Sequence, residues 1–183
     1  AGSKVEGATL YVTLEPCCHW GKTPPCADAI VEAGVSRVVC AIRDPDPRVN
    51  GGGFIKLKEA GISLSVGVCA QEAEQIMSGF FNRIRLGVPE VIVFSDPLST
   101  IPNSIDAVIR STKSTPQLCT SSGKMDLDGV EPNQLLNHLG KIGLTSVAIH
   151  DQDPLIAVLS PSRAGISAEI IRDKTTMRSS VTV

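Results

Sequence analysis

The chain has 183 residues and a formal net charge of −2, with 42% hydrophobic and 20% charged residues. This balance is typical of a globular protein with one sizeable or two small domains, and the absence of basic blocks and long apolar runs excludes a nucleic-acid surface and a membrane span. Six cysteines spread along the chain favour a reducing compartment over a disulfide framework.

The first predicted strand covers residues 10–14 and leads into a loop with two Pro-Cys steps, which end at Cys17 and Cys26. Pro24 and Pro25 suit the first turn of a helix, which we expect to begin near Cys26 and to stop at Gly34. A thiol at a helix N-terminus should ionise more readily because of the helix dipole. Two cysteines in one loop are often unremarkable, but one after a strand and one opening a helix form half of a tetrahedral zinc site.

Strands and helices continue to alternate after this loop. The residue pattern predicts strands over 37–42 and 62–68, and helices over 54–60 and 72–86. This order implies an α/β domain with a mainly parallel sheet, whose ligands collect at the carboxyl ends of its strands. Cys17 and the turn that begins at Asp44 both lie at such ends, so we expect them to face one pocket.

The second half has weaker patterns, and its best boundary with the first half is Gly87-Val88-Pro89. We expect a strand over 91–94, a Ser/Thr/Pro-rich stretch of weak pattern over 95–122, a helix over 132–142 and a strand over 146–149. Residues 168–171 read as a strand edge or a short helix, and residues 175–183 as disordered.

The loop follows the pattern C-x-H-x-G-x-T-P-P-C, and related motifs continue through Ala27-Asp28-Ala29-Ile30 and Asp44-Pro45-Asp46-Pro47. Together they resemble the deaminase domain of the bifunctional riboflavin-biosynthesis deaminase/reductase family, over most of residues 7–87. The resemblance implies a cytidine-deaminase-like three-layer α/β/α domain at residues 1–87, followed by a shortened α/β reductase-like domain at residues 88–183.

The family's activity would be zinc-dependent hydrolytic deamination of a phosphoribosylated diaminopyrimidine. The resemblance implies Cys17 and Cys26 as Zn²⁺ ligands and His19, Lys22 and Asp46 as substrate-binding residues. Asp46 replaces the Asn that is usual in the family, and an ionised Asp only accepts hydrogen bonds whereas Asn also donates.

The family's remaining zinc ligand and its general acid/base come from a His-Ala-Glu segment expected upstream of Ala1, and this sequence holds no His-x-Glu. We therefore interpret the chain as a fragment or a processed chain that lacks deaminase activity by itself. Glu15 is expected to fix the loop by hydrogen bonding and not to shuttle protons.

In the second half, His150-Asp151-Gln152 stands where the family has Glu-Gly-Gly. In the family, the two glycines let the backbone approach a dinucleotide closely. Because this chain lacks them, NADPH binding by its degenerate reductase-like half is doubtful. The alternative to an enzyme is a catalytically inactive deaminase-like module with a structural or partner-binding role. We expect a cytoplasmic location, or the plastid stroma in a plant. The sequence leaves open whether the chain forms a homo-oligomer.

Overall fold

The computed structural model describes residues 5–95, 104–111, 115–159 and 171–173. The chain divides into two compact units, residues 1–77 and 78–183, each with its own sheet. Within the described ranges, no helix is both long enough and apolar enough to span a membrane. The predicted segment 168–170 and the predicted disordered tail 175–183 lie outside the described residues.

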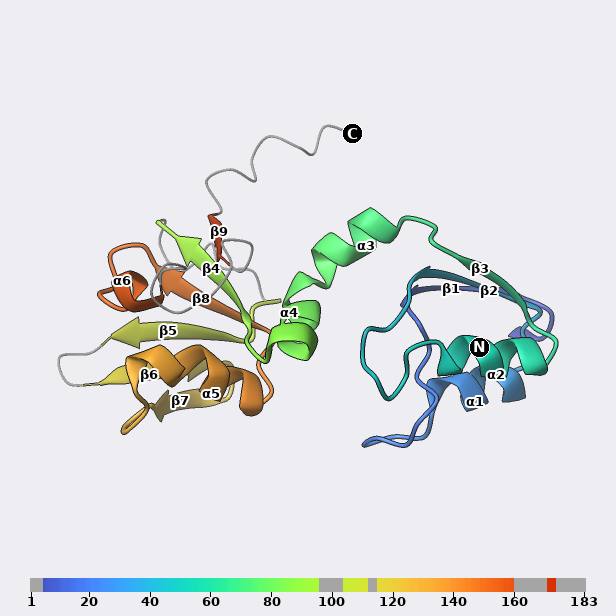
Figure 1. Cartoon of the computed structure of the whole chain (residues 1–183), viewed down its shortest axis with the longest axis horizontal. Helices are drawn as coiled ribbons and strands as arrows, with labels where there is room; N and C mark the ends of the chain where they lie inside the picture. Colours follow the sequence, from blue (N-terminus) through green and yellow to red (C-terminus); the bar gives the residue numbers. More distant parts are fainter. Residues whose placement is uncertain (1–4, 96–103, 112–114, 160–170, 174–183) are drawn as a thin grey trace. The chain divides into compact units, whose positions relative to one another are not determined.

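The first unit is built on a three-stranded parallel sheet in the order β1-β2-β3, formed by Thr9–Leu14, Arg37–Ile42 and Ser63–Val66. The central strand β2 is buried from Val38 to Ala41, as expected for a continuous apolar run covered on both faces. The predicted alternation of strands and helices around a parallel sheet is confirmed for this unit (Figure 1).

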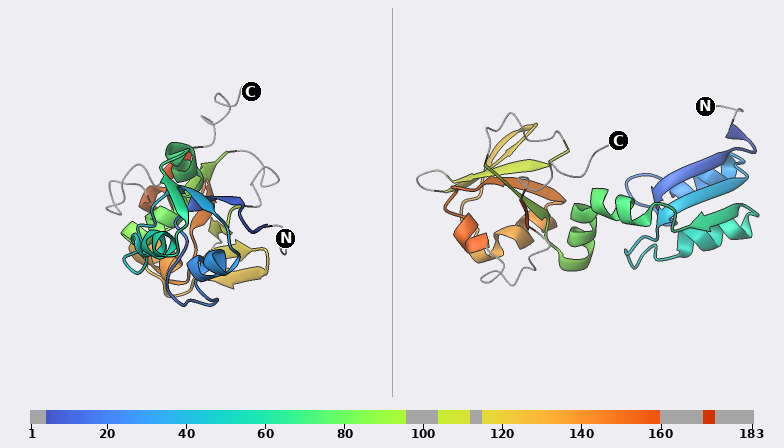
Figure 2. Two further views of the ribbon diagram at one scale, coloured as in Figure 1. Left: turned by 90° about the vertical axis from the view of Figure 1, so that its right-hand side faces the viewer. Right: turned by 90° about the horizontal axis from the view of Figure 1, so that it is seen from above.

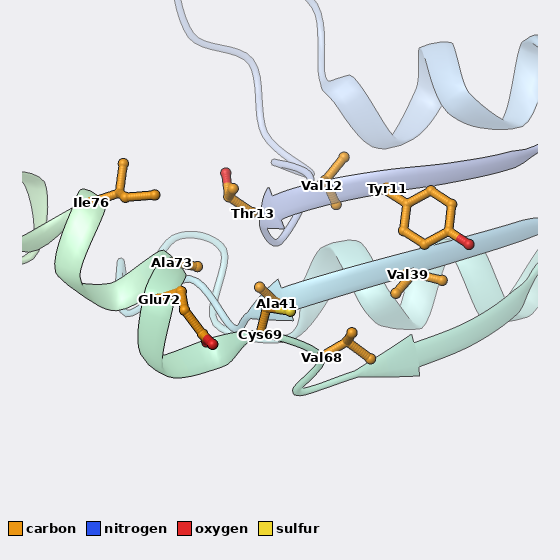
Figure 3. A pocket seen from close by; sticks show the side chains of 10 residues that line it. All are labelled: Tyr11, Val12, Thr13, Val39, Ala41, Val68, Cys69, Glu72, Ala73 and Ile76. Atoms are coloured by element: carbon orange, nitrogen blue, oxygen red, sulfur yellow. The ribbon is translucent and has the colours of Figure 1, made fainter. Parts of the chain in front are cut away.

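Helices α1 (Cys26–Glu32) and α2 (Gly52–Glu59) lie together along one face of this sheet (Figure 1). Their apolar side chains pack on that face around the fully buried Val38, Cys40 and Leu57. Helix α3 (Ala70–Ile76) contacts β1 and β2 and adds part of a layer on the other face (Figure 3). This arrangement agrees with the α/β/α class predicted from the sequence.

The single helix predicted over residues 72–86 is wrong, because the structure has α3 and a separate helix α4 (Ser78–Leu86). The amphipathic face predicted for it also fails, since Ile76 is 79% exposed while Phe81 is buried. The physical reason lies in α4, whose Gly79 comes so close to the Thr145 carbonyl that a Cβ would lie 2.3 Å from its oxygen. Helix α4 therefore belongs to the second unit, which begins ten residues before the boundary expected from the sequence.

The second unit has a six-stranded sheet in the order β7-β6-β5-β8-β4-β9 (Figure 2). The strands are β4 (Glu90–Phe94), β5 (Ala107–Ser111), β6 (Pro116–Thr120), β7 (Gly123–Asp126), β8 (Ser146–His150) and β9 (Ile171–Asp173). Strands β5, β8, β4 and β9 run parallel to one another. Strand β6 pairs antiparallel with both β5 and β7. Its core includes Leu135, Leu136 and Leu139 of α5 (Leu135–Lys141), packed with Val147 and Ile149 of β8.

The strands predicted over 91–94 and 146–149 and the helix predicted over 132–142 are confirmed, the last as a 3-10 turn, η3 (Pro132–Gln134), followed by α5. The stretch 95–122 was expected to be weakly ordered, but it contains β5 and β6. These strands lack a clear period in the sequence because β5 is inserted between β8 and β6, where sheet pairing decides its structure. A short helix, α6 (Ile156–Leu159), was also not predicted.

Candidate metal and substrate site

Cys17 and Cys26 lie close together in the segment that connects β1 to the start of α1. The backbone N–H of Cys26 donates to Sγ of Cys17 over 3.2 Å, and the N–H of Ala27 donates to the Cys17 carbonyl over 3.1 Å. Helix α1 begins at Cys26 with Pro25 as its N-cap and is followed by Gly34 at φ 68°, as the sequence predicted. The loop thus brings both thiols to one helix N-terminus.

The pKa of Cys26 differs from the sequence expectation. The helix start was expected to lower the pKa, but the pKa of Cys26 is raised, first by its side-chain hydrogen bond with Cys17 and next by loss of hydration. The side-chain hydrogen bond with Cys17 and the loss of hydration therefore favour the thiol form of Cys26, and repulsion from a second thiolate beside it adds to this preference. A bound cation would reverse this preference, since thiolates are the form that binds zinc.

The thiols of Cys17 and Cys26 are the pair that the sequence predicts as zinc ligands. Their geometry and chemistry fit two of the four ligands of a tetrahedral zinc ion. Among the residues that the structure describes, no group of three or more His, Cys, Asp or Glu side chains could hold a metal. The assignment of Cys17 and Cys26 as two zinc ligands therefore stays a prediction.

Glu15 is the structural anchor of the site. Its carboxylate is buried, and its two oxygens accept four backbone N–H groups, from Asp44 (3.2 Å), Gly51 (3.0 Å), Gly53 (2.9 Å) and Phe54 (3.2 Å). The expectation that Glu15 fixes the loop is confirmed. A carboxylate whose two oxygens are occupied by four backbone donors is poorly placed to move protons.

The glycines at the start of α2 allow this close packing. A Cβ on Gly53 would lie 1.9 Å from the carbonyl oxygen of Pro16, and one on Gly52 would lie 2.6 Å from Sγ of Cys18. Gly51 adopts φ 97°, a left-handed conformation that few other residues tolerate. The sequence indicated only backbone freedom here, whereas the structure requires glycine for contact with the cysteine loop.

A chain of hydrogen bonds connects the turn after β2 to the cysteine loop. The Asp46 N–H donates to Oδ1 of Asp44 over 2.8 Å, and the Arg48 N–H donates to Oδ1 of Asp46 over 2.9 Å. The Arg48 carbonyl in turn accepts a weak bond from the Cys18 thiol, with a sulfur–oxygen distance of 3.8 Å. The two loops therefore meet through Cys18 and Arg48, and the shared pocket expected for Cys17 and the Asp44 turn stays a prediction.

Arg48 is a site residue that the sequence interpretation missed. Its Nε lies 3.0 Å from both carboxylate oxygens of Asp46, and its Nη2 also contacts Oδ2. This guanidinium lowers the pKa of Asp46 to about 2, whereas burial raises the pKa of Asp44. The spacing of Asp46 and Arg48, two residues apart in a turn, was the available signal.

His19 lies within electrostatic reach of both aspartates: it partly offsets the rise that burial causes in the pKa of Asp44, and it adds to the lowering that Arg48 causes in the pKa of Asp46. Its ring is half-buried, and its Nδ1 is buried without a hydrogen-bond partner among the described residues. Lys22 is exposed in the same loop. Of the three predicted substrate-binding residues, the structure thus brings His19 and Asp46 together and places Lys22 at the surface of their loop.

A separate hollow of about 290 Å³ opens on the other face of the sheet (Figure 3). Its lining is mainly apolar and includes Val39 and Ala41 of the sheet and Ala73 and Ile76 of α3. None of the candidate site residues lines it. The hollow is therefore distinct from the region where the cysteine loop meets the Asp44 turn.

The strand ends of the second unit do not suit a dinucleotide phosphate. At the end of β8, Nδ1 of His150 lies 3.0 Å from Oδ1 of Asp151. The next carboxylate, Asp153, already accepts the N–H of Ser111 at 2.8 Å and its hydroxyl at 2.6 Å. Carboxylates at positions 151 and 153 repel an anionic pyrophosphate, and the lack of NADPH binding expected from the sequence stays a prediction.

Comparison with known proteins agrees with the chemistry of the cysteine loop. Residues 1–42 match the family model described as "Cytidine and deoxycytidylate deaminase zinc-binding region". The riboflavin biosynthesis protein RibD of Escherichia coli (strain K12) is 54% identical over 91 residues, which are 50% of this chain and 25% of RibD. The diaminohydroxyphosphoribosylamino-pyrimidine deaminase of Buchnera aphidicola subsp. Schizaphis graminum is 47% identical over 89 residues, 49% of this chain and 60% of that protein.

A solved structure extends the likeness of fold. The diaminohydroxyphosphoribosylaminopyrimidine deaminase/5-amino-6-(5-phosphoribosylamino)uracil reductase of Thermotoga maritima superposes with a TM-score of 0.62 at 21% identity, over 82% of this chain and 64% of its own. That share of this chain is larger than either unit alone. The resemblance to the riboflavin-biosynthesis deaminase/reductase family is confirmed by these matches, and the chain spans a quarter of the length of E. coli RibD.

Proposed function

We propose that the first unit of this chain, which resembles the RibD family of riboflavin biosynthesis, is part of a zinc-dependent deaminase for a phosphoribosylated diaminopyrimidine. The observation that carries the proposal is the contact between Cys17 and Cys26 at the start of α1. It is supported by the zinc-binding deaminase model that matches residues 1–42. In this proposal the first unit, residues 1–77, corresponds to the deaminase domain and the second unit, residues 78–183, to a degenerate reductase-like domain.

Cys17 and Cys26 would hold the zinc as thiolates. When bound, zinc supplies the Lewis acidity that makes water a nucleophile near neutral pH. His19 and Asp46 border the cysteine loop and would contact the pyrimidine or its ribose, and Lys22 would meet the phosphate. Asp46 presents only acceptors, because Arg48 lowers its pKa to about 2, and both of its oxygens already accept N–H groups of Arg48.

The chain's own residues do not complete the proton transfer. Deamination needs a general acid/base, and Glu15 is committed to four backbone N–H groups. In the family the carboxylate belongs to a His-Ala-Glu segment, and no His-x-Glu occurs in this sequence. We therefore expect this chain alone to release no ammonia from the diaminopyrimidine. A segment carrying His-Ala-Glu, joined ahead of Ala1, should restore turnover.

A second candidate is a non-catalytic module. It is favoured by the lack of a complete metal-ligand group among the described residues and by the carboxylates at the end of β8, which disfavour NADPH. The extended chain separates the two candidates: if it folds and binds zinc but releases no ammonia, the non-catalytic function is correct. If the chain is part of the enzyme, we expect it to bind a small-molecule substrate, to lie in the cytoplasm and to form a homo-oligomer.

Zinc binding tests the ligand assignment directly. The full chain should bind Co²⁺, used as a spectroscopic substitute for zinc, with the absorption typical of thiolate ligands. Cys17→Ser or Cys26→Ser should weaken binding by more than about tenfold, because even changes behind the ligands cost 10- to 100-fold. Cys69→Ser is the matched control, since Cys69 is exposed in the same unit but lies outside the loop. Equal binding by the Cys17→Ser/Cys26→Ser double variant would reject the site.

A further inference from the structure

Arg48 joins the two loops that frame the candidate site. Its backbone carbonyl contacts the thiol of Cys18, which follows the candidate zinc ligand Cys17. Its backbone N–H and its guanidinium both donate to the carboxylate of Asp46. A side chain held at three points by a neighbouring carboxylate has a defined direction.

The two members of this pair differ sharply in exposure. The side chain of Asp46 is 10% exposed, whereas that of Arg48 is 68% exposed. The Asp46 carboxylate uses Nε and Nη2 of the guanidinium, which carries five N–H donors in a rigid fork. The remaining donors therefore lie on the outer, solvent side of the pair, where an anion can reach them.

The surroundings favour an anion at this position. Lys22 adds a second exposed cation in the neighbouring cysteine loop. A carboxylate alone beside a phosphorylated ligand would repel it, but the Arg48 guanidinium neutralises Asp46. Arginine forks match the geometry of phosphate oxygens and bind them with two parallel hydrogen bonds.

We propose that Arg48 is a specificity-determining residue that binds the phosphate group of the ligand, with Asp46 as the residue that orients its guanidinium. The proposal rests on the proposed function for the identity of the whole substrate. The phosphate contact itself can be tested without deamination.

The test is binding of ribose 5-phosphate to the full chain, followed by NMR titration, with ribose as the uncharged comparison. Arg48→Ala should weaken ribose 5-phosphate binding by roughly tenfold, because it removes charge-assisted hydrogen bonds. Arg37→Ala is the matched control. It removes the same charge from the opposite end of β2, where Arg37 donates to Ser65, and it should bind like the unchanged chain.

A double-mutant cycle of Arg48 and Asp46 distinguishes two roles of Arg48: direct contact with the phosphate, and neutralisation of the Asp46 charge. If Arg48 binds the phosphate, Arg48→Ala weakens binding in the unchanged chain and also in the Asp46→Asn background. If Arg48 only neutralises Asp46, Arg48→Ala has no effect once Asp46 is Asn, and the proposal is wrong. Circular dichroism of each variant shows that the fold is kept.

The outcomes also distinguish this proposal from the proposed function. Loss of ribose 5-phosphate binding in Arg48→Ala supports the phosphate contact even if the extended chain never releases ammonia. Ammonia release with unchanged ribose 5-phosphate binding in Arg48→Ala overturns the contact and leaves the deaminase intact. Failure of the unchanged chain to bind ribose 5-phosphate better than ribose also overturns it.

Discussion

Replacing Glu15 by Gln should destabilise the first unit more than any other conservative change near the cysteine loop. The carboxylate is 3% exposed and accepts N–H groups from Asp44, Gly51, Gly53 and Phe54. Gln keeps one acceptor oxygen but turns an NH₂ group toward two of these donors. Two hydrogen bonds to a charged acceptor are lost, each worth about 1.5–3 kcal/mol, so the expected cost is about 3–6 kcal/mol.

That cost is comparable to the whole stability of a small domain, about 5–15 kcal/mol. Urea unfolding followed by circular dichroism measures the free energy, and amide hydrogen exchange locates the effect. Protection should be lost first in residues 44–54, which hold the four donors. Glu59→Gln is the control, because Glu59 is exposed at the end of α2. Unchanged exchange of residues 44–54 in Glu15→Gln would refute the anchoring role.

Three further predictions concern packing, pH and the second unit. Gly53→Ala should cost about 3 kcal/mol in urea unfolding, because its Cβ would lie 1.9 Å from a carbonyl oxygen, whereas Gly21→Ala meets nothing within 4 Å and should be neutral. Since the pKa of Asp46 is lowered to about 2, its ionised form stabilises the fold above the ordinary Asp pKa of about 3.9. That contribution is about 1 kcal/mol after allowing for the solvent-exposed arginine partner, and it should vanish as pH falls from about 4 to about 2. The difference in urea midpoint between Asp46→Asn and the unchanged chain should therefore shrink over this pH range. A constant difference would contradict the prediction. Calorimetric titration with NADPH should give no saturable heat, and saturable binding would contradict the carboxylate argument at Asp151 and Asp153.

The sequence by itself determined the features that depend on local pattern. The apolar run from Val38 to Ala41 specified a strand buried on both faces, and Pro25 placed the start of α1 at Cys26. The two Pro-Cys steps were enough to identify the thiol pair. Each of these features depends on neighbours within about ten residues, where side-chain period and backbone preference act directly.

Tertiary structure alone decided which distant groups meet. The four donors to Glu15 lie 29–39 residues away in sequence, and Cys18 finds the Arg48 carbonyl 30 residues away. Likewise, the division of the expected helix over 72–86 followed from the packing of Gly79 against Thr145. Such contacts leave no periodic pattern in the sequence, because they depend on the order of the strands in the sheet and on how closely two backbones can approach.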